Sequence, residues 1–540
     1  MLRPLIAVGT LLVVSVGSWA QEPAPKPHEA GAKAPASPAV ELDRQVIDGV
    51  TKGSHLMTNL RYLSDDIGPR LTGSSNLERA NKWTAEKMKE YGLENVRLEP
   101  WEIPVAWERG PATLKVLDGG TVRPLLVASA GWSPGTNGKV VGPVVMIEAK
   151  TKADLEKYKG KLKNAVILRS PPTPIAPITD FGASSSLTFK PEGTKKEEPK
   201  KEEPKKEEAK KDVPPLQQQR PNFEEMRAFR RELGDFLKAE GAVAILVDSA
   251  KPHGLLVTTG GWREGDRGTP QEPLPSLFVA HEHYALLHRL ATKVGAEPPK
   301  VELEVSNKFI PGPITVYNTV GEIRGSEKPD EFVVIGAHLD SWDLASGTTD
   351  NGTGSCIVLE TARVLGDLAK KGFKPKRTIR FVLFTGEEQG LYGSKEYVKK
   401  HKDEMPKTSA ALVHDTGTGK VLGFGLLGRE SVKKILEPEL VSLKGVDGWK
   451  GLSMDGIRGG TDHWSFDQAG IPGFACQQDM YEYRLTHHTQ SDTFDKANEP
   501  NLLQGATVMA ITTLRIANLP DLLPRDRPEA KKDGSRKKPD

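Results

Sequence analysis

The sequence predicts an α/β fold, a mostly parallel mixed sheet flanked by helices, with an inserted β-rich domain. Three observations predict it. After Asn318, short apolar β runs alternate with segments of helical periodicity up to Leu519, which is typical of a mostly parallel sheet covered on both faces. From about Gly110 to Val305, short β runs dominate and histidines are few. Polar clusters follow the strands of the α/β part only.

The chain of 540 residues is long enough for several domains. We predict that residues 40–110 and 307–520 form one α/β domain and that residues 111–306 form the inserted domain. Within the insertion, residues 193–213 repeat Lys, Glu and Pro almost without apolar side chains, which predicts a disordered surface loop. Residues 521–540 are charged and contain proline, so we expect a disordered tail.

Residues 1–20 have the features of a secretory signal peptide. Arg3 supplies the positive start, 5–16 the apolar core, and 18–20 a small-x-small cleavage site. The apolar core is shorter than the roughly 20 residues that a membrane span needs. Residues 21–39 are a Pro/Ala linker. We therefore expect a mature protein without a membrane span that is secreted or periplasmic.

Charge and cysteine content exclude some classes. The net charge of +3, with nearly balanced acids and bases, gives no reason to expect nucleic acid as a partner. Two cysteines, Cys356 and Cys476, exclude a disulfide framework and a cysteine-based zinc site. Both stand among apolar residues, so we expect buried free thiols rather than a bridge.

The predicted elements follow in order along the chain. The first part of the α/β domain has helices at 42–63 and 77–91, the second ended by the C-cap Gly92, and a strand at 96–105. In the insertion we expect strands at 143–147, 164–168, 242–247 and 275–279 and helices at 223–239 and 282–294. After Asn318 we expect strands at 332–335, 379–384, 410–413 and 421–427 and helices at 354–370, 390–401, 431–443 and 501–518.

Polar clusters follow apolar runs or glycine turns in the α/β domain. They are His338 to Asp343, Asp350-Asn351-Gly352, Glu387-Glu388, His414-Asp415, and His487-His488 with Asp492. In open α/β sheets, functional groups gather at the carboxyl ends of strands. Nitrogen and oxygen ligands of this kind suit a pair of divalent ions, zinc or similar, held by a bridging carboxylate.

Each cluster alone has a simpler interpretation. His338 and Asp340 could be a solvated pair at a strand end, and Glu387-Glu388 could favour a helix N-terminus through the helix dipole. Asp350-Asn351-Gly352 could be a turn or an N-cap. Their occurrence together in one α/β domain favours the metal site.

The order of these motifs carries a resemblance. His-x-Asp-Ser, Asp-Asn-Gly-x-Gly, Thr-Gly-Glu-Glu-x-Gly-Leu-x-Gly-Ser, an Asp after a strand, and His-x-x-x-Asp-Thr resemble the co-catalytic zinc exopeptidases of clan MH. These include bacterial leucyl aminopeptidases, carboxypeptidase Q and glutamate carboxypeptidases. The resemblance covers about Leu42 to Leu519, and Ile67 to Ser74 matches an early family segment. The insertion resembles a protease-associated domain and, with the paired histidines, favours the carboxypeptidase Q-like branch.

The resemblance implies two Zn²⁺ per chain, although the ligands would also accept cobalt or manganese. His338 would bind one zinc, and Asp350 would bridge both. Glu388 and Asp415 would each bind one zinc. His488, which fits the His-x-x-x-Asp-Thr pattern better than His487 does, would bind the zinc shared with Glu388.

Further roles follow from the resemblance. Asp340 would orient the His338 imidazole, and Glu387 would be the general base, taking a proton from metal-bound water and returning it to the leaving amine. His487 stands where some members have a tyrosine, so we expect it to donate to the developing oxyanion. Asp462-His463 matches a family pattern near the substrate, with a packing role as an equal alternative.

We therefore predict a secreted two-zinc exopeptidase whose partner is a small peptide. Aminopeptidase and dipeptidase or carboxypeptidase activity both stay open; a C-terminal specificity would need a cationic pocket, for which Arg458 or Arg484 are candidates. A non-catalytic receptor-like module is the alternative, although no metal ligand is missing. A glutaminyl cyclase-like acyltransferase is a further alternative, and a homodimer is an open option.

Overall fold

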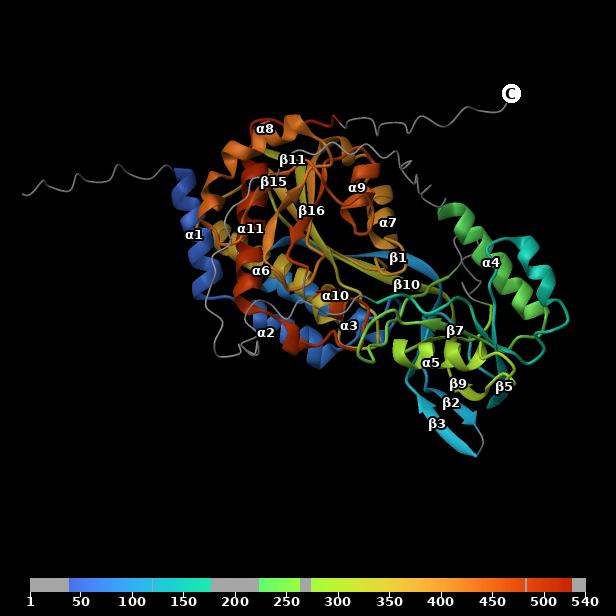
Figure 1. Cartoon of the computed structure of the whole chain (residues 1–540). Coiled ribbons are helices and arrows are strands. Elements are labelled where there is room, and N and C mark those ends of the chain that lie inside the picture. Colours follow the sequence, from blue (N-terminus) through green and yellow to red (C-terminus); the bar gives the residue numbers. More distant parts are fainter. Residues whose placement is uncertain (1–37, 119, 176–222, 263–272, 481–482, 527–540) are drawn as a thin grey trace, which may run out of the picture.

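The computed structural model describes residues 38–118, 120–175, 223–262, 273–480 and 483–526 (Figure 1). The predicted signal peptide, nearly all of the predicted linker and the whole Lys/Glu/Pro loop lie outside these ranges. Of the predicted tail, residues 521–526 are described, and Leu523 is buried against the main core. These first residues of the tail are therefore part of the fold.

An eight-stranded mixed sheet organises the larger part of the chain. Its strands stand in the order β1-β10-β12-β11-β13-β16-β14-β15. Their bounds are β1 Glu94–Glu108, β10 Lys308–Ile323, β11 Lys328–His338, β12 Arg377–Phe384, β13 Thr408–Val413, β14 Val421–Gly425, β15 Gly451–Ser453 and β16 Gly473–Gln478. The central strands β12, β11, β13 and β16 are parallel, whereas β1 and β10 are antiparallel additions on one side. The predicted mixed sheet is confirmed.

Helices cover both faces of this sheet because its central strands bury alternate side chains on each side. Val333 and Ile335 face the core shared with the helices of one side, and Val334 faces Tyr397 and Phe466 on the other. The first side carries α1 Pro38–Lys52, α2 Leu56–Arg61, α3 Ser75–Glu90, α6 Thr353–Lys370 and α11 Glu499–Asn518. The second carries α7 Tyr392–Lys400 and α9 His463–Gln468. The short helix α10 spans Tyr483–Thr486.

Some predicted boundaries are wrong. The helix predicted at 42–63 is interrupted between α1 and α2, where the His55 N–H donates to the Glu360 carboxylate at 3.1 Å, and a π-helix, Tyr62–Ile67, follows α2. The helix predicted at 431–443 ends earlier, since α8 spans Glu430–Glu439 with Pro438 in its last turn. The sequence did not predict strands β10, β15 and β16. In β10, glycine and proline interrupt the β pattern.

A second eight-stranded sheet lies between Ala112 and Val305, in the order β3-β2-β9-β5-β6-β7-β8-β4. Its strands are β2 Ala112–Asp118, β3 Thr121–Leu125, β4 Val127–Ser129, β5 Val140–Met146, β6 Val166–Leu168, β7 Ala244–Asp248, β8 Ser276–Val279 and β9 Lys300–Val305. Helix α4, Phe223–Ala239, packs on one face, and α5, His281–Ala291, packs on the other. We call this part the second unit and the rest the main unit; its identity as a protease-associated domain stays a prediction.

Two long strands join the units (Figure 1). β1 leads into the second unit and β10 leads back, and they pair in antiparallel fashion from Glu94 with Glu322 to Glu108 with Lys308. Indole rings from both units meet at the junction, where Trp132 of the second unit packs edge-on against Trp342 of the main unit at 6.4 Å. The units are thus held together by main-chain pairing and by an aromatic contact.

Two further predictions bear on the class of protein. In the part of the chain that the structure describes, no helix combines the length and apolar character needed to cross a membrane. Cys356 and Cys476 are free and buried, which confirms the predicted state of both thiols.

Candidate active site

The polar clusters meet because their strands are parallel and in register. His338 ends β11, and its main chain lies opposite Phe384, the last residue of β12. Gly336 of β11 lies opposite Val413, the last residue of β13. The side chains that come next in sequence, Glu387-Glu388 after β12 and Asp415 after β13, therefore converge on His338 at one edge of the sheet.

A buried arginine shapes the loop that follows β11. The Arg70 guanidinium, with no exposed surface, donates to the carbonyl oxygens of Leu339 at 2.7 Å, Ser346 at 2.8 Å and Gly347 at 2.6 Å. Gly347 has a φ of 61°, and a Cβ there would lie 2.2 Å from the Cβ of Ser341, so only glycine fits the turn. This loop delivers Asp350 to the site.

Asp350 stands between the two histidines that were predicted to bind different metal ions. The Asp492 carboxylate fixes its backbone by accepting from the N–H groups of Thr349 at 2.5 Å and Asp350 at 3.1 Å. Asp350 Oδ1 is 3.3 Å from His338 Nε2, and Asp350 Oδ2 is 3.4 Å from His488 Nε2. One carboxylate therefore reaches both sides of the cluster.

The His338 ring is held at both nitrogens. Nε2 lies 2.9 Å from Asp415 Oδ1, and Nδ1 lies 3.0 Å from the main-chain oxygen of Asp340. The Asp340 carboxylate is farther from Nδ1, at 3.6 Å. The ring thus contacts Asp340 chiefly through the backbone rather than through the predicted side chain.

The Asp340 carboxylate instead supports the glutamate pair. Fully buried, it accepts hydrogen bonds from the Thr72 hydroxyl at 3.0 Å and from the N–H groups of Glu387 and Glu388 at 3.3 Å each. This carboxylate therefore ties the turn after β12 to the end of β11, a contact that sequence reasoning missed.

His488 completes the opposite side of the cluster. Its Nε2 lies 2.9 Å from Glu388 Oε2, and its ring packs edge-on against Trp342 at 6.0 Å. Its φ of 61° is unusual for a residue with a side chain, and its carbonyl oxygen accepts from the Thr258 N–H of the second unit at 2.9 Å.

The second unit makes further contacts with the loop that carries this histidine pair. Val257 and Thr489 form an antiparallel bridge. The Gln490 side chain accepts from the Leu256 N–H at 2.6 Å and donates to the Gly254 carbonyl at 3.2 Å. Residues 254–258 thereby hold the loop that presents His488 to Asp350 and Glu388.

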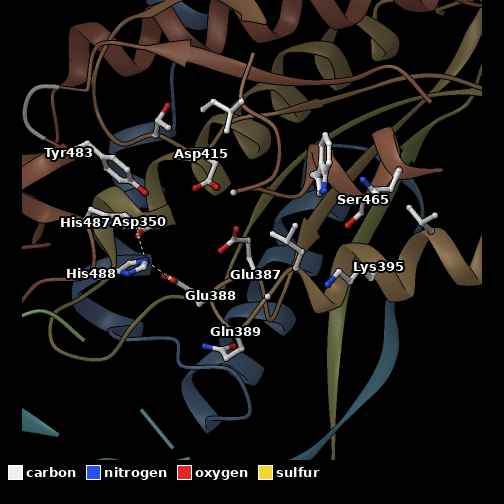
Figure 2. A pocket seen from close by; sticks show the side chains of 18 of the residues that line it. Asp350, Glu387, Glu388, Gln389, Lys395, Asp415, Ser465, Tyr483, His487 and His488 are labelled. Carbon is white, nitrogen blue, oxygen red and sulfur yellow. Dashed lines mark ion pairs between the residues drawn. The ribbon is translucent and has the colours of Figure 1, made fainter. Parts of the chain in front are cut away.

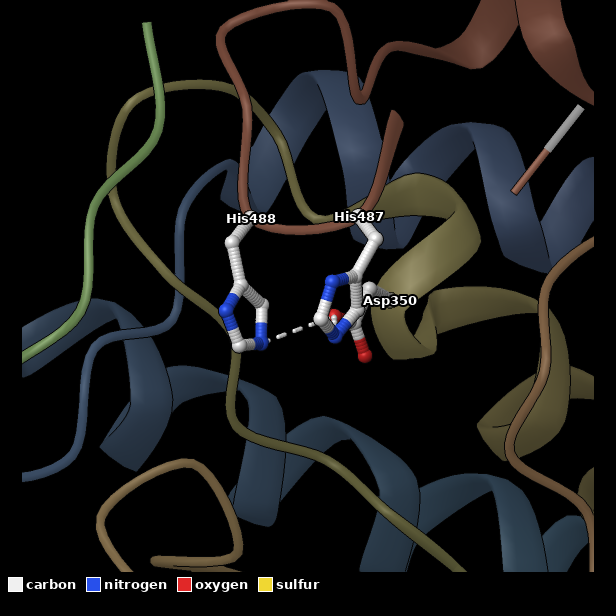
Figure 3. Close-up of side chains that lie close together, drawn as sticks. All are labelled: Asp350, His487 and His488. Carbon is white, nitrogen blue, oxygen red and sulfur yellow. Dashed lines mark ion pairs between the residues drawn. The ribbon is translucent and has the colours of Figure 1, made fainter. Parts of the chain in front are cut away.

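His487 lies beside His488 rather than opposite it (Figure 3). The two rings stack at 3.7 Å, and the other face of the pair adjoins Tyr483, 5.0 Å from His487. His487 Nε2 is 3.9 Å from Asp350 Oδ2, and its side chain is 41% exposed. His488, closer to Asp350 and in contact with Glu388, occupies the better ligand position, as the motif spacing favours.

A cavity of about 1070 Å³ opens beside the cluster (Figure 2). Its lining includes Asp350, Glu387, Glu388, Asp415, Tyr483, His487 and His488, together with residues of α7 and α9. Neither Arg458 nor Arg484, the predicted candidates for a cationic pocket, lines it; both are exposed.

Burial and crowding of charges shift the protonation of the site. Burial, with the charge of Asp415, raises the pKa of Glu387 well above its ordinary value. Burial and the charge of Asp350 do the same for Glu388. Burial acts to lower the pKa of His338, but the charge of Asp415 and contacts with the surrounding carboxylates raise it well above its usual range. The cluster thus favours an added positive charge.

The donor set fits a pair of divalent cations. Asp350 Oδ2 and Glu388 Oε1 are buried without a hydrogen-bond partner among the described residues, a costly state that a cation would relieve. His338, Asp350 and Glu388 offer ligand atoms within 4.8 Å of one another, and so do Asp350, His487 and His488. Imidazole nitrogens with carboxylate oxygens are a ligand set that zinc accepts.

The two residues of the Asp462-His463 pair, for which a role near the substrate and a packing role were the alternatives, have different surroundings. The Asp462 carboxylate is fully buried, and neither oxygen has a hydrogen-bond partner among the described side chains and backbone; burial raises its pKa to about 7. The His463 Nε2–H donates to the Ile457 carbonyl at 2.8 Å, which is a structural contact. Sequence reasoning missed Asp492 and Arg70 as supports, although both stood inside the matched motifs.

Comparisons with known proteins show which proteins the chain is similar to. Residues 318–513 match peptidase family M28. The chain is similar to carboxypeptidase Q of Bos taurus, 29% identical over 466 residues that cover 86% of each chain, and to that of Homo sapiens, at 28% with the same coverage.

Solved structures extend the likeness to the fold. The structure of a peptidase M28 precursor from Shewanella amazonensis SB2B matches with a TM-score of 0.69 and 25% identity, covering 90% of this chain and 98% of that one. A zinc aminopeptidase from Bacillus subtilis matches with a TM-score of 0.56 and 20% identity, covering 85% and 93%. The predicted resemblance, fold and enzyme class are confirmed: residues 318–513 match peptidase family M28, and the chain is a peptide hydrolase.

Proposed function

We propose that the protein is a secreted two-zinc exopeptidase that releases single residues from small peptides. One observation carries the proposal. Asp350 presents one oxygen to His338 at 3.3 Å and the other to His488 at 3.4 Å, which is the arrangement expected of a carboxylate shared by two ions. Secretion rests on the signal-peptide features of residues 1–20.

The ligands divide into two groups around Asp350. His338 and Asp415, in contact at 2.9 Å, would hold one ion, and Glu388 and His488, also 2.9 Å apart, would hold the other. When bound, two zinc ions supply Lewis-acid stabilisation of the scissile carbonyl and lower the pKa of the attacking water.

Glu387 is the side chain suited to move protons. It lines the cavity beside the cluster, and its backbone is fixed by the Asp340 carboxylate. Burial raises its pKa well above the ordinary value, so it readily accepts a proton from water and returns it to the leaving amine. It takes part as a base rather than as a ligand.

His487 is placed to donate to the oxyanion that develops on the substrate carbonyl. It lines the cavity, and partial burial of its ring with the charge of His488 lowers its pKa to about 4. It is therefore neutral at pH 7, with one ring N–H to donate, a contribution of roughly 3 kcal/mol when the geometry is right. His487→Ala should lower kcat more than zinc content; equal loss of both would make His487 a ligand instead.

The test combines metal content with hydrolysis of two substrate panels, aminoacyl chromogenic amides and unblocked dipeptides. Wild type should bind about two zinc per chain and cleave one panel. Glu387→Gln should keep the zinc and lose activity by about a thousandfold, whereas Glu430→Gln, an exposed acid on α8, should change neither. Full activity of Glu387→Gln would refute the assigned base, and a metal-free, inactive wild type would favour the receptor-like alternative.

A further inference from the structure

Among the residues that the structure describes, Lys395 of the cavity lining has no acidic partner. Lys395 projects from α7 into the cavity (Figure 2). Among the described residues, no carboxylate lies within ion-pair distance of its ammonium group, which lies over the Tyr392 ring, 5.4 Å from the ring centre. A cation in this position is available to a ligand.

The other lysine of the cavity is already paired. Lys399 stands one helical turn after Lys395 and also lines the cavity, but its ammonium group lies 3.1 Å from the Glu396 carboxylate. It therefore provides a matched comparison on the same helix.

The charges of the cavity are separated in space. The acidic group around Asp350 occupies one side, and Glu387 lies between that group and Lys395 (Figure 2). Apolar side chains form much of the wall near α7 and α9, namely Val398, Ile457, Trp464, Ala469 and Met480. A ligand that spans the cavity would meet the side chains around Asp350 at one end, an apolar wall along its length, and the Lys395 ammonium group beyond Glu387.

We propose that Lys395 binds the free carboxylate of the residue that leaves, so that the preferred substrates are dipeptides, or longer peptides cleaved at their last bond, with an uncharged C-terminal side chain. The inference rests on the proposed function, because Glu387 must return its proton to the leaving nitrogen. The carboxylate is attached to the same α-carbon as that nitrogen. It therefore lies just beyond Glu387, where a charge-assisted hydrogen bond to an ammonium group stabilises it.

The kinetic test compares the dipeptide Ala-Leu with its C-terminal amide, Ala-Leu-NH₂, on zinc-loaded enzyme. Lys395→Met should raise KM for the dipeptide about tenfold, with kcat within about twofold and KM for the amide unchanged. Lys395→Arg should keep most of the wild-type preference for the dipeptide over the amide. Lys399→Met should resemble wild type. Unchanged selectivity between the two substrates in Lys395→Met, or equal losses on both, would overturn the inference.

A binding measurement separates this inference from the proposed function. Calorimetry with leucine and with leucinamide needs no turnover. Tighter binding of leucine by wild type, lost in Lys395→Met, supports the carboxylate site even if neither substrate is cleaved. Equal binding of leucine by wild type and Lys395→Met refutes it, even if the enzyme is an active exopeptidase.

Discussion

The two sheets have similar architecture but opposite chemistry at the ends of their parallel strands. In the second unit, β7 ends in Asp248, and α5 begins with His281, a carboxylate and an imidazole 3.1 Å apart. The same Asp248 accepts from the N–H groups of Thr173 at 2.8 Å and Ala250 at 3.0 Å. In the main unit, Asp350 and Glu388 each keep a buried oxygen without a hydrogen-bond partner among the described residues.

The difference shows that an acid and a histidine at a strand end do not by themselves make a site. Asp248 is satisfied by Thr173, Ala250 and His281 and so ties together the segments that carry them. The acids of the main unit contact His338 and His488, but Asp350 and Glu388 each keep a buried oxygen without a hydrogen bond among the described residues, and a bound cation would offset its desolvation. The second unit acts on the chemistry differently, through residues 254–258, which hold the loop of His487 and His488.

The largest expected effect is the loss of activity on replacing Asp350, compared with the replacement of Asp248. Asp350→Ala should lower kcat/KM by about a thousandfold or more and reduce bound zinc, while the metal-free protein unfolds at nearly the wild-type temperature because one buried charge is removed. Asp248→Ala should retain the activity of the folded protein but cost about 1–3 kcal/mol in unfolding free energy. Activity assays, metal analysis and urea unfolding of both variants test this. Loss of activity in Asp248→Ala with full activity in Asp350→Ala would invalidate the comparison.

A core substitution in the second unit tests how far stability and catalysis separate. Leu303 of β9 is fully buried in the apolar core of that sheet. Leu303→Ala should lower the unfolding free energy of the second unit by about 2–5 kcal/mol and leave kcat of the folded enzyme near wild type. Thermal unfolding and assays at low temperature would show this. A proportional fall in kcat would mean that the whole second sheet, not only its contact segment, supports the site.

The contact between the units is tested by two matched glutamines. Gln490 bonds the main chain of Gly254 and Leu256 in the second unit, whereas Gln504 bonds both main-chain groups of Val421 within the main unit, at 2.9 Å each. Gln490→Ala should weaken zinc binding and catalysis by about tenfold, because the His488 loop loses its support. Gln504→Ala should reduce stability by about 1 kcal/mol with unchanged activity; similar behaviour of both would mean that the second unit merely packs nearby.

The smallest effect concerns a buried acid of the main unit outside the site. The Glu99 carboxylate lies 2.9 Å from His401 and 2.8 Å from Arg97. Burial acts to raise its pKa, but the bond and charge of His401 and the charge of Arg97 lower the pKa from 4.5 to about 2.

This contact should therefore stabilise the fold above pH 4.5 and lose that effect as the pH falls toward 2. Glu99→Gln should be less stable than wild type at pH 6 and closer to it at pH 3, measured by urea unfolding. An equal difference at both pH values would show that the Glu99 charge contributes nothing.

Local patterns in the sequence were enough to predict the α/β class, the order of most elements and the meeting of His338, Glu388 and Asp415. These follow from local periodicity, and parallel strands in register bring their carboxyl ends to one edge. The short strands β15 and β16 and the break after α1 lacked such a pattern.

The remaining features became visible only in the three-dimensional structure, because they are contacts between residues far apart in the chain. It showed that the Asp340 backbone faces His338 while its carboxylate supports Glu387 and Glu388. It brought residues 254–258 against the loop of His488. It also turned Lys395, rather than Arg458 or Arg484, into the cavity. No periodicity encodes these choices, since each depends on how the two units and the helices around the sheet pack together.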